Sequence, residues 1–195
     1  MCYFIAEGYH YTRNINKYTF RLFLFALISH FPYVLVFAQA EGAMGLVPFY
    51  SGILNQTSVM WSLAVGLVML RVANSEYKEN TKAVLVVLLC LVSLPADWSC
   101  IASLCILAIG TNRGDFKTQM RWMLIYTAMY AVVYIFTIDA VYGILQMAVA
   151  LSIPVLKLYN GQRGKNRSIN KAMKWLFYIY YPLHLLILGL VQRSI

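Results

Sequence analysis

The sequence predicts an all-α protein, a polytopic bundle of transmembrane helices, and three observations support this prediction. First, 61% of the 195 residues are hydrophobic and only 12% are charged, whereas soluble domains have about 25% charged residues. Second, long apolar runs alternate with short polar stretches, a pattern typical of membrane-spanning helices. Third, the alternating strands of about ten residues that build a membrane β-barrel are absent. We therefore expect a single transmembrane domain over residues 1–195.

About seven apolar spans and a partial N-terminal helix account for the chain. The partial helix, residues 1–11, would cover only about 16 Å of a hydrocarbon core roughly 30 Å thick, so we expect its span to be truncated. The predicted spans are Thr19–Ala38, Thr57–Ala73, Ala83–Leu94, Trp98–Gly110, Trp122–Ile138, Tyr142–Leu158 and Trp175–Val191. The third and fourth would be only about 18–20 Å long. The turn between them, Pro95–Asp97, is therefore expected to lie below the membrane surface.

The basic residues predict the orientation of these spans. When the spans alternate in direction, all of the sixteen Lys and Arg residues except Arg193 fall on one side. The positive-inside rule makes this side the cytoplasm. The formal net charge of +9 then follows from membrane orientation, so we expect contact with membrane lipid and no nucleic-acid partner.

The cysteines do not predict a metal site. The four residues are Cys2, Cys90, Cys100 and Cys105. They lack the close Cys-x-x-Cys spacing and the neighbouring histidines of a zinc site. We expect them to be small residues facing lipid or the helix bundle, with no metal bound.

Two histidines are expected near the middle of the bilayer. His184 lies about 15 Å along its helix from the cytoplasmic Lys174, close to Pro182, and His30 is at a similar depth in the first span. Ionisable side chains at this depth are costly, so they indicate a functional site. The alternative for each histidine is a structural role, in which the ring bonds a backbone carbonyl or a neighbouring helix. Tyrosines of the last span, including Tyr181, could line a polar path beside His184.

Three more titratable residues are candidates. Glu7 and His10 are three residues apart, which on a helix lets the carboxylate orient the imidazole. The alternative is a solvated salt bridge to Arg13. Asp97 is expected to be recessed, because irregular backbone inside a membrane must line a wet cavity or be covered by protein. Asp139 is expected to be an ordinary turn residue.

Several blocks of sequence resemble the TraX family of membrane proteins. The more specific blocks are the N-terminal segment that starts at Ile5-Ala6-Glu7-Gly8-Tyr9-His10 and runs to Ser29, and the closing Tyr181-Pro182-Leu183-His184. The weaker matches are Thr57–Trp61, Gly66-Leu67, the turn at Asp97 and Tyr142–Gln146. Together these blocks cover essentially the whole chain.

The resemblance implies a multi-pass protein of the bacterial cytoplasmic (inner) membrane, related to the pilin acetylase of conjugative plasmids. Acetyl-CoA would be the donor, and the acceptor would be the amine of a pilin-like N-terminus or a hydroxyl. Such chemistry needs a base and an oxyanion donor. We expect His184 to be the base, oriented by Asp97 or Glu7, with a tyrosine such as Tyr181 as the oxyanion donor.

A basic cluster would hold the phosphates of the donor, although binding of anionic lipid is the commoner role for such a cluster. Its members are Arg163, Lys165, Arg167, Lys171 and Lys174.

The chain departs from the family pattern in two places. Family members usually begin with a further span that contains an Asp-His pair, and they commonly carry acidic residues where this chain has His30 and near Val34. Two alternatives to an acyltransferase therefore stay open. One is a non-enzymatic membrane transporter or assembly factor, and the other is an inactive, truncated relative.

Overall fold

The computed structural model describes residues 1–37, 57–137, 139–159, 164 and 166–194. These residues form helices and, apart from one isolated bridge between Thr57 and Ala96, no β-structure. The prediction of an all-α protein is confirmed for this part of the chain.

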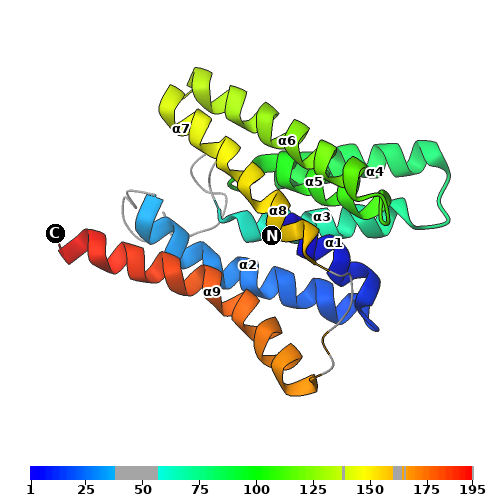
Figure 1. Ribbon diagram of the computed structural model, residues 1–195, viewed down its shortest axis with the longest axis horizontal. Helices are drawn as coiled ribbons and strands as arrows, with labels where there is room; N and C mark the ends of the chain where they lie inside the picture. The colour runs from blue at the N-terminus through cyan, green and yellow to red at the C-terminus, as the bar shows by residue number, and fades with distance from the viewer. Residues whose placement is uncertain (38–56, 138, 160–163, 165, 195) are drawn as a thin grey trace.

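The helices follow one another with short connections (Figure 1). Their bounds are α1 Cys2–Tyr11, α2 Ile15–Phe37, α3 Val59–Ala73, α4 Glu79–Ser93, α5 Ser99–Thr111, α6 Phe116–Thr137, α7 Ala140–Gln146, the 3-10 helix η2 Met147–Leu151, α8 Ser152–Lys157 and α9 Arg167–Ser194. Each predicted span corresponds to one helix, except that α7, η2 and α8 together occupy the span predicted at Tyr142–Leu158.

Three helices begin earlier than their apolar spans because polar residues cap them. Asn14, Asp115 and Asn166 each precede the first residue of α2, α6 and α9, and each side chain accepts a hydrogen bond from a backbone N–H shortly after it. Asn and Asp are favoured caps because they satisfy N–H groups that have no partner within the helix. Lys171 and Lys174, which lie between two of the predicted spans, are therefore helical.

Four helical segments are long and apolar enough to cross a membrane: Ile15–Phe37, Phe116–Thr137, Ala140–Lys157 and Ser168–Gln192. By contrast, α3, α4 and α5 have 15, 15 and 13 residues. Helices of this length rise only about 20–23 Å. The prediction of about seven spans is thus not confirmed, whereas four candidate spans are found in the described residues.

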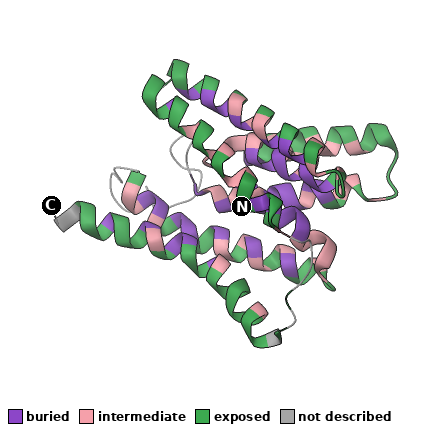
Figure 2. Cartoon of the chain, in the orientation of Figure 1, coloured by how far each residue is buried: buried purple, intermediate pink, exposed green. Residues whose placement is uncertain are grey.

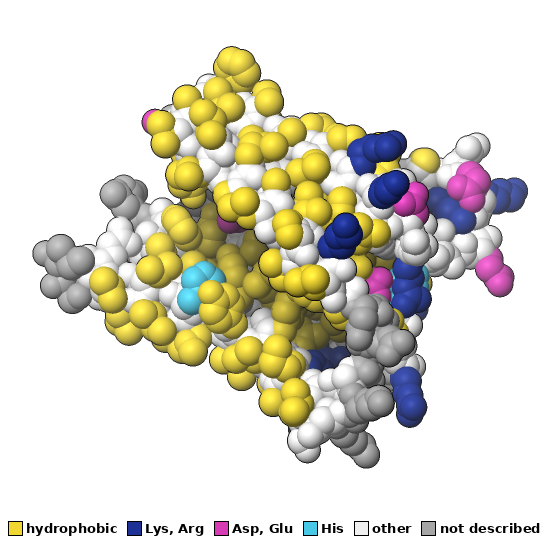
Figure 3. Space-filling view, in the orientation of Figure 1, with side chains coloured by type: hydrophobic (Ala, Val, Ile, Leu, Met, Phe, Trp, Pro, Cys, Tyr) yellow, Lys and Arg dark blue, Asp and Glu magenta, His cyan; other side chains and the backbone are white. Residues whose placement is uncertain are grey.

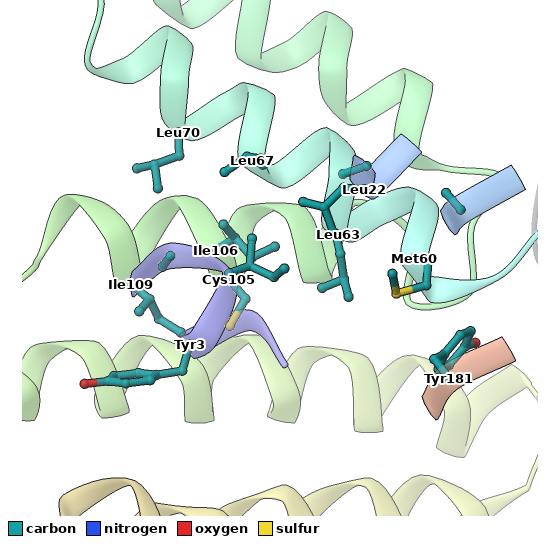
Figure 4. Packing of buried hydrophobic residues seen from close by; sticks show 14 of the residues in the cluster. Tyr3, Leu22, Met60, Leu63, Leu67, Leu70, Cys105, Ile106, Ile109 and Tyr181 are labelled. Atoms are coloured by element: carbon teal, nitrogen blue, oxygen red, sulfur yellow. The ribbon is translucent and has the colours of Figure 1, made fainter. Parts of the chain in front are cut away.

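The best-buried part of the molecule is the contact between α3 and α5, which brings Leu63 and Leu67 against Ile106 (Figure 4). Small residues allow this close approach. A Cβ at Gly66 would lie 2.9 Å from the Cα of Ser103, and the Ser103 hydroxyl donates to the Ser62 carbonyl at 2.7 Å. Small and hydroxyl residues are typical of helix contacts in membranes, where tight packing supplies the attraction.

The remaining helices surround this contact in two groups. The pair α2 and α9 lies along one side, and α4, α6 and the α7–α8 segment lie along the other (Figure 1). Buried residues concentrate on the inward faces, whereas the outer faces of α4, α6, α7 and α9 are exposed (Figure 2). These exposed faces are rich in large apolar side chains, as expected of surfaces that contact lipid.

Candidate functional site

The turn between α4 and α5 holds Asp97 directly before two residues with strained backbone. The Asp97 N–H donates to the Thr57 carbonyl at 2.8 Å, and the Thr57 N–H donates to the Pro95 carbonyl at 3.2 Å. The next two residues, Trp98 and Ser99, have φ values of 63° and 44°. Non-glycine residues in this region carry strain that often accompanies a functional site. The turn fixes Asp97 against the first residues before α3.

The Asp97 carboxylate accepts hydrogen bonds from two directions. Its Oδ1 lies 3.0 Å from the Trp98 backbone nitrogen and 3.1 Å from the Tyr130 hydroxyl of α6. The Tyr130 hydroxyl is also 2.6 Å from the Tyr134 hydroxyl. Since a hydroxyl has one proton, Tyr130 donates to Asp97 and Tyr134 donates to Tyr130. The indole of Trp98 stacks on Tyr130 with ring centroids 4.6 Å apart, which orders this chain of hydroxyls.

His30 meets the same turn from α2. Its Nδ1 lies 3.2 Å from the Thr57 hydroxyl, and the residue is only 1% exposed. Because Asp97 also contacts Thr57, the structure brings two of the predicted site residues together around one threonine. The hydroxyl bond fits the structural alternative for His30.

His184 has a different environment on α9. It is half-exposed, and its Nδ1 lies 3.1 Å from the Tyr180 carbonyl, one helical turn earlier. A carbonyl only accepts hydrogen bonds, so Nδ1 carries the proton and Nε2 keeps the lone pair. The ring stacks on Tyr180 with centroids 5.1 Å apart and meets Tyr181 edge-on at 5.2 Å. The imidazole is therefore oriented by its own helix, with its basic nitrogen pointing away from that helix bond.

Tyr181 connects His184 to the Asp97 turn. It is 9% exposed, and its hydroxyl lies within electrostatic range of the Val59 N–H at the start of α3 and of the Asp97 carboxylate. The surface is hollowed between α9 and the α7–α8 segment, with a histidine on the α9 side and an acidic side chain in the floor (Figure 3). Tyr181 thus brings its hydroxyl group into the region shared by the His184 ring and the Asp97 carboxylate.

The partners predicted for Glu7 and His10 are wrong. The Glu7 carboxylate lies 3.5 Å from Nε of Arg113, and Nε2 of His10 lies 3.2 Å from the Gly110 carbonyl. Neither residue contacts the other or His184 among the described interactions. Both instead attach α1 to the C-terminal end of α5, and the salt-bridge partner is Arg113, not Arg13. Spacing within one helix does not reveal a partner about a hundred residues away.

The predicted orienting groups for His184 are also corrected. No described hydrogen bond joins His184 to Asp97 or Glu7, and the Tyr180 carbonyl takes that role. Sequence reasoning also missed Thr57, Tyr130 and Tyr134. Only the i, i+4 spacing of the two tyrosines, which places both hydroxyls on one face of α6, could have indicated them.

The basic cluster is described only in part. Arg163 and Lys165 lie outside the described residues, and Arg167 begins α9 with a side chain that is also outside them. Lys171 and Lys174 are exposed on the first turns of that helix. Within the described residues, no group of three or more His, Cys, Asp or Glu side chains could hold a metal ion, and all four cysteines are free.

The fold and the site define a helical membrane protein with a polar centre formed by short, tightly packed helices. The family model of the TraX protein matches residues 1–192, so the chain belongs to the TraX family. It is also similar to a probable fimbrial assembly protein, FimC of serogroup H1, from Dichelobacter nodosus. The two are 25% identical over a match that covers 96% of this chain and 76% of the relative. No solved structure matches the chain.

Proposed function

We propose that the protein is an acyltransferase of the bacterial inner membrane that transfers an acetyl group from acetyl-CoA to an amine, or to a hydroxyl, presented at the membrane. The acceptor we favour is the N-terminal amine of a pilin-like protein. This acceptor is supported by the resemblance to pilin acetylases and by the similarity to a relative described as a probable fimbrial assembly protein.

One observation carries the proposal: His184 presents a basic nitrogen beside a buried tyrosine. The Nδ1–H is held by the Tyr180 carbonyl at 3.1 Å, which leaves Nε2 as the proton acceptor. A histidine in this tautomer is suited to general-base catalysis, a contribution of about 10²- to 10⁴-fold in rate. The carbonyl bond also fits the structural alternative for His184, so the proposal depends on the second ring nitrogen, Nε2, and on the adjacent Tyr181.

The reaction assigns one task to each group. As the neutral amine attacks the thioester carbonyl, the new N–C bond forms and Nε2 of His184 takes the proton from the amine. The carbonyl oxygen becomes an oxyanion, which accepts a hydrogen bond from the Tyr181 hydroxyl. The neighbouring Val59 N–H can only donate a hydrogen bond, so the proton of the Tyr181 hydroxyl stays available for the oxyanion. When the C–S bond breaks, the imidazolium returns the proton to the leaving thiolate.

Asp97 acts in this scheme as a positioning residue. It holds the Tyr130 hydroxyl at 3.1 Å, and its negative charge lies near Tyr181. A carboxylate close to the reaction centre also favours the approach of an ammonium group, which must lose its proton before it attacks. His30 supports the same turn through Thr57.

The proposed orientation places all predicted spans in the inner membrane with the basic loops in the cytoplasm. The short helices α3, α4 and α5 then cross only part of the bilayer thickness, and the Asp97 turn lies inside it. The N-terminal end of α9, with Arg167 and the neighbouring Arg163 and Lys165, would face the cytoplasmic donor. Membrane lipid surrounds the exposed apolar faces.

The test is acetylation of a pilin-like peptide by the purified chain in lipid nanodiscs, supplied with deuterated acetyl-CoA and followed by mass spectrometry. The wild-type protein is expected to add one labelled acetyl group to the terminal amine. His184→Ala should lower the rate by about 10²- to 10⁴-fold. The matched control is His10→Ala, whose ring bonds a backbone carbonyl elsewhere. If His184→Ala acetylates as fast as wild type, His184 is not the base.

A non-enzymatic assembly factor is the second candidate, favoured by the similarity to a probable fimbrial assembly protein. In this case the chain would bind a pilin-like helix without modifying it. Cells that produce wild-type protein would then assemble pili with unmodified termini, and His184→Ala would support the same assembly. The inactive, truncated relative would give neither product.

A further inference from the structure

A cavity of about 760 Å³ lies between α1, α2 and the first half of α9. This volume falls within the range of about 300–1,000 Å³ that small-molecule sites occupy. Figure 3 shows a recess beside the N-terminal half of α9 with basic atoms inside it. The cavity is separate from the Asp97 turn, and Tyr180 is the one lining residue that also belongs to the site described above.

The lining of the cavity is strongly positive. Arg13, Lys17, Arg21 and Lys174 line it, and no acidic residue does. Lys17 and Arg21 are four residues apart on α2, a spacing at which like charges repel each other. Cations gathered in a concave site raise the local positive potential. A bound anion would relieve this repulsion.

Arg21 has a buried donor that the described residues do not satisfy. Its Nε is buried without a hydrogen-bond partner, while its guanidinium lies in hydrogen-bond contact with Tyr178. Arginine does not lose its charge in proteins, and a buried donor without a partner is costly. Guanidinium groups match phosphate oxygens in geometry and charge. The orphaned Nε therefore indicates a phosphate-bearing ligand.

The other walls are aromatic and apolar. Tyr11, Tyr18 and Phe177 line the cavity. Gly8 lets Tyr18 approach α1, since a Cβ there would lie 2.7 Å from the tyrosine oxygen. Aromatic faces suit the stacking of a nucleotide base. The cavity thus combines groups for phosphates with groups for a flat ring.

The cavity reaches the proposed reaction centre along α9. Tyr180 lines the cavity and also stacks on His184, with ring centroids 5.1 Å apart. From Lys174 to His184 the helix rises about 15 Å. A donor whose phosphates lie at Lys174 and Arg21 would therefore need a long arm to present its thioester at His184, and coenzyme A thioesters have this form.

We infer that the cavity between α1, α2 and α9 binds the phosphate groups of the acyl donor, whose arm extends along α9 to His184. This inference rests on the proposed function and assigns the donor site to Arg13, Lys17, Arg21 and Lys174, a set that differs from the predicted loop cluster. The same phosphate chemistry occurs in the headgroup of an anionic phospholipid, so the test separates these two sources.

The experiment measures binding without reaction. Coenzyme A is titrated by calorimetry into the full chain in nanodiscs of neutral lipid, with pantetheine, which lacks phosphates, as the comparison ligand. Arg21→Gln and Lys17→Gln are each expected to weaken coenzyme A binding by about 10- to 100-fold, the effect of a lost hydrogen bond to a charged group. Lys171→Gln is the matched control, because Lys171 lies on the same helix but not in the cavity lining, and it should change binding by less than about twofold. Lys17 is exposed, so its variant tests the site even when Arg21→Gln fails to fold.

Each outcome has one meaning. Unchanged coenzyme A binding in both cavity variants overturns the inference. The inference is also overturned if the cavity variants lose bound anionic lipid in native mass spectrometry but keep coenzyme A binding. This result would assign the cavity to a lipid headgroup. His184→Ala should bind coenzyme A like wild type. If the chain binds coenzyme A through Arg21 but acetylates no acceptor, the cavity inference stands and the proposed reaction fails.

Discussion

The packed centre of the molecule, where α3 meets α5, and the inward face of α9 give their histidines opposite surroundings. At the edge of the packed centre, His30 is 1% exposed and its ring bonds the Thr57 hydroxyl. On α9, His184 is half-exposed and its only described hydrogen bond is to its own helix. The predicted depth of the two residues is similar. Two histidines predicted at similar depth therefore differ in their surroundings, which fit a structural role for His30 and the proposed role as base for His184.

The polar groups of the two regions differ in the same way. In the packed centre, the hydroxyls of Ser62 and Ser103 bond carbonyls of α3, and small residues close the gap between helices. Beside α9, the Arg21 guanidinium has a buried nitrogen without a partner. The hydroxyls of Ser29 and Ser58, near the packed centre, are also buried without a partner, but an unpaired charged donor is costlier to bury than a hydroxyl. A ligand is therefore expected first at Arg21.

The strongest test of this comparison replaces each histidine by alanine. His30→Ala should lower the free energy of unfolding by about 2–3 kcal/mol, because it creates a cavity and removes the partner of the buried Thr57 hydroxyl. His184→Ala should leave thermal stability nearly unchanged. Thermal unfolding in detergent, followed by circular dichroism, measures both. Equal loss of stability in the two variants would remove the distinction between the regions.

A substitution inside the packed centre should have the next largest effect. Gly66→Ala would place a Cβ 2.9 Å from the backbone Cα of Ser103, which cannot move aside as a side chain could. Overpacking of this kind costs about 1–3 kcal/mol. The control is Ala83→Val, which adds apolar volume to the exposed face of α4. If the Gly66→Ala protein unfolds at the same temperature as the wild type, α3 and α5 pack less tightly than described.

The smallest effect is expected at Asp139, which belongs to neither region. Its carboxylate accepts from the Val141 and Tyr142 N–H groups at 2.6 and 3.0 Å and so caps α7. Asp139→Ala should cost about 0.5–2 kcal/mol of stability, while Asp139→Asn keeps the cap. Acetylation by the folded protein should not change in either variant. A loss of activity in Asp139→Asn would give this carboxylate a role in chemistry.

Hydropathy predicted much of the fold because each helix in a membrane must satisfy its own backbone. The seven apolar spans correspond to helices in the described residues, and even the short N-terminal segment is helical. Helix starts were less predictable, since Asn14, Asp115 and Asn166 extend helices into polar sequence where hydropathy has no signal. The sequence also could not show that the helices at Val59–Ala73 and Ser99–Thr111 would pack into the most buried contact.

The candidate site was predicted by its residues but not by its contacts. Tyr181 contacts the His184 ring and lies within electrostatic range of Asp97. Glu7 and His10 instead attach α1 to α5. Pairs such as Glu7 and Arg113 join distant parts of the chain, and one sequence contains no signal for such a pair. The cavity at Arg21 escaped prediction for the same reason, because its cations come from α2, α9 and the link after α1.

The sequence alone is enough to predict that the chain is helical and membrane-like, that its cations gather in the loops on one side of the predicted spans, and that a histidine interrupts its last apolar run. These properties follow from composition and periodicity, which act along the chain. The fold is needed to show which histidine is buried, which carbonyl bonds His184 and which cations share a cavity. Such properties depend on the relative placement of helices, and this placement results from close packing at positions such as Gly66 and Gly8.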